Sequence, residues 1–366
     1  MPISGFDLIV NRSDLTQTQV VEAQFPDTLA DGTCLLRIDR FALTANNITY
    51  AVAPDAMGYW NFFPADADGF GRVPVWGYAE VIATAHPQIE TGTRLYGYLP
   101  MSTHLVIEPG QINAFSMMDV TPHRQDMSAI YNQYSFASHD PAYAPDREGL
   151  ISLFRPLFTT SFLLDDWHRR EDCFGATTLV LSSASSKTAL GMAFLMARDK
   201  PKGLTIVGLT SPGNVEFTKN LGCYDQVLAY SDLETLPQTK TAFVDMAGDA
   251  DLLRRIHAHF DANLTSSCRV GLTHWQTTSN HIDGLTGGPK PAFFFAPTYA
   301  QDRIKDWGPQ DFQKRVDTAS AAFYQDAARW VQISAASGPD AVTNAYLEML
   351  AGRIDPAKGH ILSMLA

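Results

Sequence analysis

The stretch TTLVLSSASSKTALGMAFLMARD (177–199) decides the fold of this chain. It opens with an apolar run typical of a buried strand, passes through a turn of small hydroxyl residues, and closes with a helical apolar pattern. Alternating strands and helices of such length predict a parallel, doubly wound sheet, and therefore an α/β fold. The alternation continues toward the C-terminus, with strands expected at 204–210, 225–230, 241–248 and 268–275 and helices at 214–222 and 251–260.

The first 150 residues have a different pattern. Residues 33–41 (TCLLRIDRF) alternate apolar and polar side chains, as a half-buried strand does, and Pro and Gly recur throughout the segment. This predicts short strands joined by turns, in a small barrel or sandwich. Residues 150–165 predict a helix on at least one side of Pro156. The chain after Asp302 is expected to be helical before a last strand at 359–365.

Length, charge and cysteine usage narrow the class of protein. The 366 residues leave room for two domains, and the net charge of -12 argues against a nucleic-acid partner, which needs clustered Lys and Arg. The four cysteines are widely spaced, which is typical of idle thiols in a reducing compartment. We expect no signal peptide and no membrane span, because no stretch has the required apolar length. The sequence therefore predicts a cytoplasmic protein with a small-molecule partner.

Several stretches resemble, in order, the medium-chain dehydrogenase/reductase group. They are LRIDRFALTANNITYAV (36–52), VPVWGYAEVIATAHPQIETGTRLYGYLP (73–100), KNLGCYDQVLAY (219–230) and YLEMLAGRIDPAKGHILSML (346–365). The first resembles the strand and loop that carry active-site residues in the group. More narrowly, ASSKTALG, GLTSPGN, DMAG and GLTHW together resemble a branch known only as a domain of unknown function. The resemblance implies a GroES-like catalytic domain at 1–150 and 301–366, a Rossmann cofactor-binding domain at 151–300, and a homodimer.

The turn after the first α/β strand bears on whether a dinucleotide binds. Such a turn normally contains glycines, which let a pyrophosphate approach backbone N–H groups and a helix N-terminus. Here Ala, Ser, Lys and Thr replace them, and only Gly191 remains nearby. In one interpretation, Ser185, Ser186 and Thr188 add hydroxyl donors, and Lys187, the first lysine of the chain, neutralises pyrophosphate or a 2′-phosphate. In the other, the turn binds no ligand and Lys187 is a solvated loop residue.

The end of the second α/β strand bears on which nicotinamide cofactor would bind. NAD-selective sites usually carry an acid there that accepts from the ribose 2′-hydroxyl, whereas this chain offers Thr210, Ser211 and Asn214. Hydroxyls and an amide can bind a 2′-phosphate without repelling it, so the stretch favours NADPH. The alternative is that Ser211, Pro212 and Gly213 only make a turn and Asn214 caps the next helix, and both interpretations can hold together. Thr160 and Asp245 resemble positions of the group near phosphate and adenosine.

Three residues are candidates for the chemistry. Reduction of an activated double bond requires a hydride, stabilisation of a carbonyl oxygen, and a proton donor. Asn47, with its neighbour Asn46, is a candidate hydrogen-bonding group toward a nicotinamide, a ribose or a substrate carbonyl. Tyr50 is a candidate for donating a proton or for stabilising an enolate oxygen. His274 follows a predicted strand at the edge where a nicotinamide would lie. The simpler alternatives are a buried packing role for Tyr50 and a capped or core histidine at 274.

Two functions of different classes remain open from the sequence. No His and Cys spacing suggests a metal site, so the resemblance implies an NADPH-dependent, zinc-free reductase of an enone, enoyl thioester or quinone-like substrate. Trp76, Trp275 and YWNFF (59–63) suggest an aromatic-walled pocket for an apolar or aromatic substrate, although ordinary core packing also explains single aromatic residues. The second function is a reductase-like fold without hydride chemistry that serves as a binding or sensing module. The glycine-poor turn favours this second function.

Overall fold

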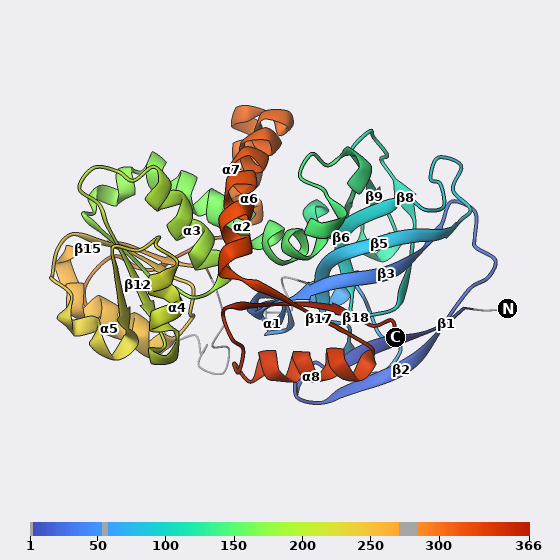
Figure 1. Cartoon of the computed structure of the whole chain (residues 1–366), viewed down its shortest axis with the longest axis horizontal. Coiled ribbons are helices and arrows are strands. Elements are labelled where there is room, and N and C mark those ends of the chain that lie inside the picture. The colour runs from blue at the N-terminus through green and yellow to red at the C-terminus, as the bar shows by residue number, and fades with distance from the viewer. Residues whose placement is uncertain (1–2, 53–57, 271–283) are drawn as a thin grey trace. The chain divides into compact units, whose positions relative to one another are not determined.

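The computed structural model describes residues 3–52, 58–270 and 284–366. The chain forms two compact units, which Figure 1 shows in full. The first unit contains Met1–Leu153 and Gln332–Ala366, and the second contains Phe154–Val331. Residues 301–331, which we expected in the β-rich domain, therefore group with the second unit.

The second unit is built on a six-stranded parallel sheet. Its strand order is β13-β12-β11-β14-β15-β16, the order of a doubly wound nucleotide-binding sheet, with the topological switch between β11 and β14. The predicted α/β class is thus confirmed. The strands are β11 (Thr178–Leu181), β12 (Thr205–Thr210), β13 (Gln226–Ala229), β14 (Thr241–Asp245), β15 (Leu264–Arg269) and β16 (Ala292–Phe293).

Helices cover this sheet and explain where the unit ends. They are α2 (Glu148–Arg170), α3 (Lys187–Arg198), α4 (Val215–Asn220), α5 (Ala250–Phe260), α6 (Ala296–Trp307) and α7 (Pro309–Trp330). Helix α5 buries Leu253 and Ile256 in one cluster with strand residues such as Phe243. The ring of Phe323 in α7 lies 4.5 Å from that of Phe158 in α2, and it also contacts α3. Because α7 packs on α2 and α3, it belongs to the second unit.

Helix α2 contains a buried histidine that makes stability depend on pH. His168 is fully buried, and its Nδ1 lies 2.8 Å from the carbonyl oxygen of Leu164. Burial lowers the pKa of His168 from 6.5 to about 4. Between pH 6.5 and pH 4, His168 is therefore protonated in the unfolded chain but stays neutral in the folded protein. The free energy of unfolding consequently decreases as the pH falls from 6.5 toward 4.

We predict that His168→Phe reduces the loss of unfolding free energy between pH 7 and pH 4 by up to about 3 kcal/mol. Phenylalanine does not titrate and retains an aromatic ring beside Trp167 and Phe174. Urea unfolding at several pH values measures the effect. His139→Phe, at an exposed position, is the control for the loss of a histidine and should change the free energy of unfolding at pH 7 by less than about 0.5 kcal/mol. The same slope in wild type and His168→Phe would contradict the prediction.

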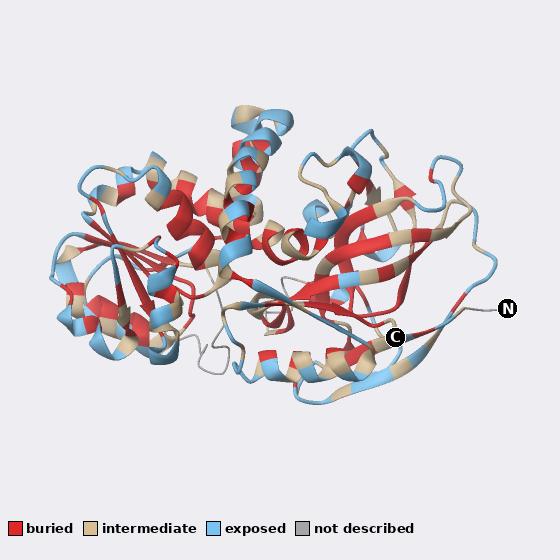
Figure 2. Ribbon diagram, viewed as in Figure 1, coloured by how far each residue is buried: buried red, intermediate tan, exposed pale blue. Residues whose placement is uncertain are grey.

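The first unit is β-rich, as expected. A nine-stranded sheet has the order β17-β18-β3-β5-β6-β10-β9-β8, with β7 paired to β3, and a smaller sheet has the order β2-β1-β4. The strands are β1 (Ile3–Asn11), β2 (Thr18–Phe25), β3 (Cys34–Leu43), β4 (Phe70–Gly71), β5 (Pro74–Thr84), β6 (Arg94–Pro100), β7 (His104–Ile107), β8 (Pro109–Gly110), β9 (Ser116–Asp119), β10 (Gln133–Phe136), β17 (Gln332–Ser337) and β18 (Lys358–Ser363). Buried residues concentrate on β3, β5 and β6 (Figure 2).

The first unit also contains two α-helices, α1 and α8. Helix α8 (Pro339–Leu350) precedes the closing strand β18, and helix α1 (Ala45–Val52) follows β3 directly. We expected a loop where α1 forms, after the strand that contains residues 36–41, and this expectation was wrong. Buried Ile48, Tyr50 and Ala51 form the apolar side that holds the short helix against the unit.

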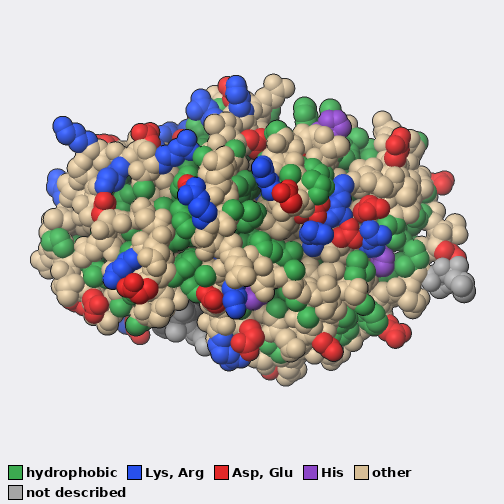
Figure 3. Space-filling view, in the orientation of Figure 1, with side chains coloured by type: hydrophobic (Ala, Val, Ile, Leu, Met, Phe, Trp, Pro, Cys, Tyr) green, Lys and Arg blue, Asp and Glu red, His purple; other side chains and the backbone are tan. Residues whose placement is uncertain are grey.

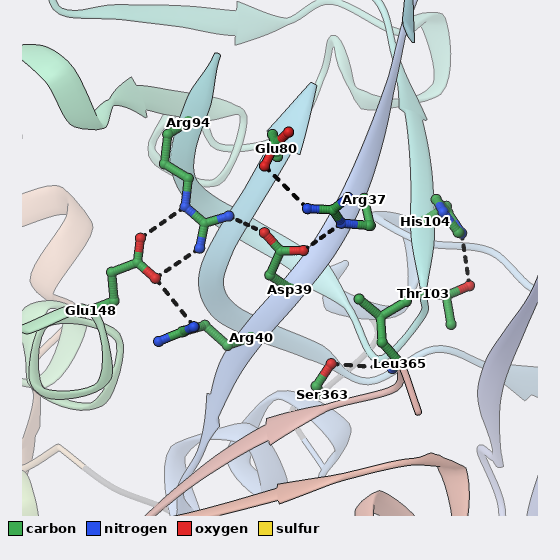
Figure 4. A network of polar contacts seen from close by, with 10 residues as sticks. All are labelled: Arg37, Asp39, Arg40, Glu80, Arg94, Thr103, His104, Glu148, Ser363 and Leu365. Atoms are coloured by element: carbon green, nitrogen blue, oxygen red, sulfur yellow. Dashed lines mark hydrogen bonds and ion pairs between the residues drawn. The ribbon is translucent and has the colours of Figure 1, made fainter. Parts of the chain in front are cut away.

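A network of charged side chains fixes the start of α2 on the large sheet (Figure 4). Arg94 of β6 donates to both carboxylate oxygens of Glu148, at 2.8 and 2.7 Å, and it also pairs with Asp39 of β3. Arg40 lies 3.2 Å from the same Glu148. The Glu148 side chain is buried, so these charge-assisted bonds offset the cost of removing its carboxylate from water.

Surface charges of both signs are mixed. On the face drawn in Figure 3, Lys and Arg side chains lie interspersed with Asp and Glu side chains. Among the described residues, none of the helices combines the length and the apolar character that a membrane span needs.

Candidate functional site

The turn between β11 and α3 keeps a tight backbone without glycine. Ser183 has a φ of 49°, in the left-handed region that normally favours glycine. A non-glycine residue there costs about 1 kcal/mol. The Ser183 N–H donates to the Tyr230 hydroxyl at 3.0 Å, which helps to hold this conformation. The sequence could not show this contact, because Tyr230 follows a different strand.

A buried hydrogen-bond cluster joins the ends of the two strands that flank the topological switch. Ser182 Oγ donates to Asp245 Oδ1 at 2.8 Å and accepts from the N–H groups of Met246 and Ala247 at 2.8 and 3.0 Å. Asp245 also accepts from the Gly248 N–H at 3.0 Å. Burial raises the pKa of Asp245, and these hydrogen bonds offset part of the rise. Asp245 was predicted from the sequence, whereas Ser182 was not, because its role depends on this cross-strand contact.

Three of the residues expected to bind cofactor lie together. Thr210 Oγ1 and Asn214 Nδ2 each donate to Ser185 Oγ at 3.1 Å. Because Ser185 accepts both bonds, its own hydrogen is available to a third group. Thr210 is buried, so it positions Ser185, whereas Asn214 is half-buried and the neighbouring Ser211 is exposed.

Asn214 does not cap the next helix with its side chain. It occupies the N-cap position of α4 but makes no side-chain capping bond. Its amide instead reaches Ser185, in the turn after β11. The capping alternative is therefore wrong, and the side chain links the ends of two parallel strands.

The first turn of α3 carries the other predicted phosphate-binding residues. Ser186 is the N-cap, and its Oγ accepts from the Ala189 N–H at 3.3 Å. Lys187 and Thr188 follow as the first helical residues, both half-buried. A helix N-terminus favours anions because its first N–H groups have no carbonyl partner within the helix. This 12-residue helix therefore starts with a serine hydroxyl and a lysine at its positive end.

Helix α2 approaches α3 closely at the one remaining glycine. A Cβ added to Gly191 would lie 2.6 Å from Ser161 Oγ, so no larger residue fits without a shift. Ser161 Oγ donates to the Thr188 carbonyl at 2.7 Å. Thr160, which we had expected near a phosphate, donates to the Pro156 carbonyl at 3.2 Å within its own helix. Ser161 is thus the residue that links α2 to the first turn of α3.

In the first unit, the hydroxyl of Tyr50 accepts two N–H bonds. Asn46 Nδ2 donates to it at 2.7 Å and Trp76 Nε1 donates at 3.1 Å. The side chain is buried, and its ring lies 4.7 Å from Tyr59 and 5.4 Å from Tyr98. Burial raises the pKa of Tyr50, whereas the two N–H donors act in the opposite direction. With two N–H groups bonded to its oxygen, this hydroxyl can still donate one hydrogen bond.

Asn47 is occupied by backbone contacts. Its Oδ1 accepts from the Thr44 N–H at 2.7 Å, and its Nδ2 donates to the Pro74 carbonyl at 2.9 Å. These bonds tie the start of α1 to the start of β5. In the structure Asn47 therefore positions the helix that carries Asn46 and Tyr50.

The other aromatic residues near Tyr50 form a packed cluster. Tyr59, Phe62 and Phe63 are buried, and Tyr98 and Tyr131 lie 4.8 Å apart between their ring centroids. Ordinary core packing accounts for these contacts. The predicted site residue His274, together with Trp275, lies outside the described residues.

The family is identified by its sequence model. The model described as "Protein of unknown function (DUF2855)" matches residues 41–355. The chain belongs to this family. No curated protein matches the sequence.

Solved structures show which fold this DUF2855 chain has. It resembles CurA from Vibrio vulnificus in complex with NADPH (14% identity, 99% of each chain, TM-score 0.57). It also resembles the yhdH oxidoreductase from Salmonella enterica in complex with NADP (11% identity, 99% of each chain, TM-score 0.55). A third is a mutant enoyl thioester reductase from Candida tropicalis (11% identity, 99% of this chain and 100% of that one, TM-score 0.56). The medium-chain dehydrogenase/reductase fold is confirmed.

Metal ligands are not gathered in the described part of the DUF2855 chain. Within residues 3–52, 58–270 and 284–366, no three His, Cys, Asp or Glu side chains converge in a way that could hold a metal ion. All four cysteines are buried and free of disulfides.

Proposed function

We propose that this chain is an NADPH-dependent, zinc-free reductase of an enone, enoyl thioester or quinone-like substrate. The observation that carries the proposal is the cluster of Ser185, Thr210 and Asn214 at the carboxyl ends of β11 and β12. Ligands of doubly wound sheets bind at these ends. The NADPH and NADP complexes of CurA and the yhdH oxidoreductase support the same cofactor.

The residues at the turn fit a phosphorylated dinucleotide. The turn keeps its tight backbone through Ser183, and it leads into the N-terminus of α3, where Ser186 and Lys187 lie. Ser185 offers a hydroxyl hydrogen, and Asn214 retains a second amide hydrogen. The end of β12 carries no acid that would repel a 2′-phosphate. When bound, NADPH would supply the hydride.

In the proposed reaction, Tyr50 donates the proton to the substrate. An activated double bond that receives a hydride at one carbon needs a proton at the neighbouring carbon. Tyr50 has an available hydrogen, and Asn46 and Trp76 would stabilise the oxygen after the proton leaves. Asn47 holds this helix in place. By resemblance to the group, we further expect a cytoplasmic homodimer. Light scattering of the purified protein measures its oligomeric state.

A second function is favoured by one feature of the turn. Ser186 Oγ caps the Ala189 N–H, so this amide is already occupied by the protein itself. Ser183 N–H is likewise occupied by Tyr230. A binding or sensing module without hydride chemistry is compatible with a turn whose N–H groups are bonded within the protein. This alternative predicts no oxidation of NADPH by any substrate.

A reductase assay separates the two functions. Purified protein is mixed with NADPH and, in turn, with crotonyl-CoA, 3-buten-2-one or 9,10-phenanthrenequinone, and the absorbance at 340 nm is followed. We expect turnover with at least one of them, and weaker turnover with NADH. Absence of turnover with all three, despite NADPH binding, would overturn the reductase and favour the binding module.

Lys187→Ala tests the phosphate end of the site. We predict that it weakens NADPH binding about tenfold more than NADH binding, because a charge-assisted contact to the 2′-phosphate is lost. Titration of nicotinamide fluorescence measures both dissociation constants. Lys240, an exposed residue immediately before β14, is the matched control, and Lys240→Ala should change neither constant. Equal weakening of the two cofactors would remove Lys187 from the 2′-phosphate role.

A further inference from the structure

Trp76 is oriented toward the Tyr50 hydroxyl by its neighbours on the large sheet. It lies on β5, opposite Tyr98 of β6 in the antiparallel register. Its indole stacks on Tyr96 at 5.8 Å with an interplanar angle of 18°, and it lies 5.0 Å from Tyr98. These two rings restrict the tilt of the indole. The indole N–H is therefore held in the direction of Tyr50, 3.1 Å away.

The neighbouring hydroxyls do not compete for the Tyr50 oxygen. Tyr59 and Tyr131 bond to each other, with their oxygens 3.2 Å apart. Asn46 supplies the second N–H donor, from one helical turn before Tyr50. Two N–H groups from different elements thus converge on one buried oxygen. This arrangement matches what a negative charge on that oxygen would require.

We propose that Trp76 is a positioning residue whose indole N–H stabilises the phenolate that forms when Tyr50 donates its proton. The inference rests on the proposed function. In the step, the O–H bond of Tyr50 breaks, its electron pair stays on the phenolic oxygen, and a C–H bond forms at the substrate carbon. The neighbouring carbon receives hydride from the reduced nicotinamide dinucleotide, and water restores the Tyr50 proton.

The hydrogen bond itself is tested without catalysis. The chain has six tryptophans, so the indole region of a ¹⁵N–¹H spectrum is simple, and Trp76→Phe assigns the signal of Trp76. We expect Tyr50→Phe to move this indole proton upfield, because the acceptor oxygen is lost and the ring remains. Trp60 donates to the Ala51 carbonyl at 3.1 Å, so its signal is the control and should not move. An unmoved Trp76 signal would overturn the inference.

The catalytic role is tested by a double-mutant cycle. The probe is NADPH with whichever of crotonyl-CoA, 3-buten-2-one or 9,10-phenanthrenequinone the wild type reduces. Trp76→Phe should lower kcat about tenfold or more in the wild-type background and have no further effect in the Tyr50→Phe background. NADPH affinity should stay within about twofold. The matched control, Trp60→Phe, should act equally in both backgrounds.

Failure of the inference and failure of the proposed function give different results. If Trp76→Phe lowers kcat by the same factor in both backgrounds, or has no effect, the role of Trp76 is wrong, whereas the reductase function is unaffected. If Tyr50→Phe retains full activity, or if no substrate is reduced, the proton-donor function falls and the role of Trp76 falls with it. The indole signal then still reports whether the hydrogen bond exists.

Discussion

Tyr50→Phe is expected to lower kcat by about a hundredfold or more while NADPH affinity stays within about twofold. A positioned general acid contributes about 10²–10⁴ to a rate, and phenylalanine removes only the hydroxyl that would supply the proton. The ring contacts with Tyr59 and Tyr98 remain, so the packing of α1 should be retained. Steady-state kinetics with NADPH and a reducible substrate measure the change.

Tyr59→Phe is the matched control for this prediction. Tyr59 lies in the same cluster, and its hydroxyl contacts only Tyr131 among the hydrogen bonds of the described residues. We expect a change in kcat of less than about threefold and a similar melting temperature for both variants. Full activity of Tyr50→Phe would return Tyr50 to a packing role and contradict the mechanism.

Arg124→Met is expected to lower the free energy of unfolding by about 3–5 kcal/mol. Arg124 is almost fully buried, and its Nη1 lies 2.6 Å from the carboxylate of the equally buried Asp119. It also donates to Asn132 Oδ1 at 2.9 Å and to the Tyr131 carbonyl at 2.7 Å. Its removal leaves the carboxylate of Asp119 buried without a countercharge, which is the main cost. Urea denaturation measures the loss.

The exposed Arg147 provides the comparison for this variant. Arg147→Met should change the free energy of unfolding by less than about 0.5 kcal/mol. A double variant, Arg124→Met with Asp119→Leu, should recover part of the stability, because the unpaired charge is gone. A loss below about 1 kcal/mol for Arg124→Met would show that Asp119 is not left as a buried, unpaired charge.

The alternation of strands and helices was readable from the sequence because local patterns produce it. The apolar run at 178–181 and the helix at 187–198 both lie where the pattern of 177–199 predicted them. The second strand and the helix of 250–260 follow for the same reason. Runs of apolar residues were sufficient for the two strands and for α3, because β11, most of β12 and the middle of α3 are buried along consecutive residues.

Long-range contacts decided what the sequence could not show. Ser183 adopts a positive φ although it is not glycine, and its N–H is bonded to Tyr230. Helix α1 forms from ANNITYAV, whose Asn and Thr residues favour loops, because Asn47 bonds to Pro74 of another strand. Strand β17 was missed because its mostly exposed residues carry no apolar pattern. The strand is held at the edge of the large sheet by its parallel pairing with β18.

The boundary of the second unit was also hidden from local patterns. Residues 301–331 are helical, as expected, but a helix does not reveal which unit it joins. Phe323 packs on Phe158, in α2, and on Phe194, in α3. Such aromatic contacts between distant segments cannot be read from spacing alone.

The most direct test of NADPH binding at the turn after β11 is a titration of the purified protein with NADPH and NADH, followed by nicotinamide and tryptophan fluorescence. We predict saturable NADPH binding at micromolar concentrations and weaker NADH binding, because the end of β12 offers hydroxyls and an amide instead of an acid. Binding of neither cofactor would contradict it, and would mean that the turn after β11 no longer accepts a dinucleotide.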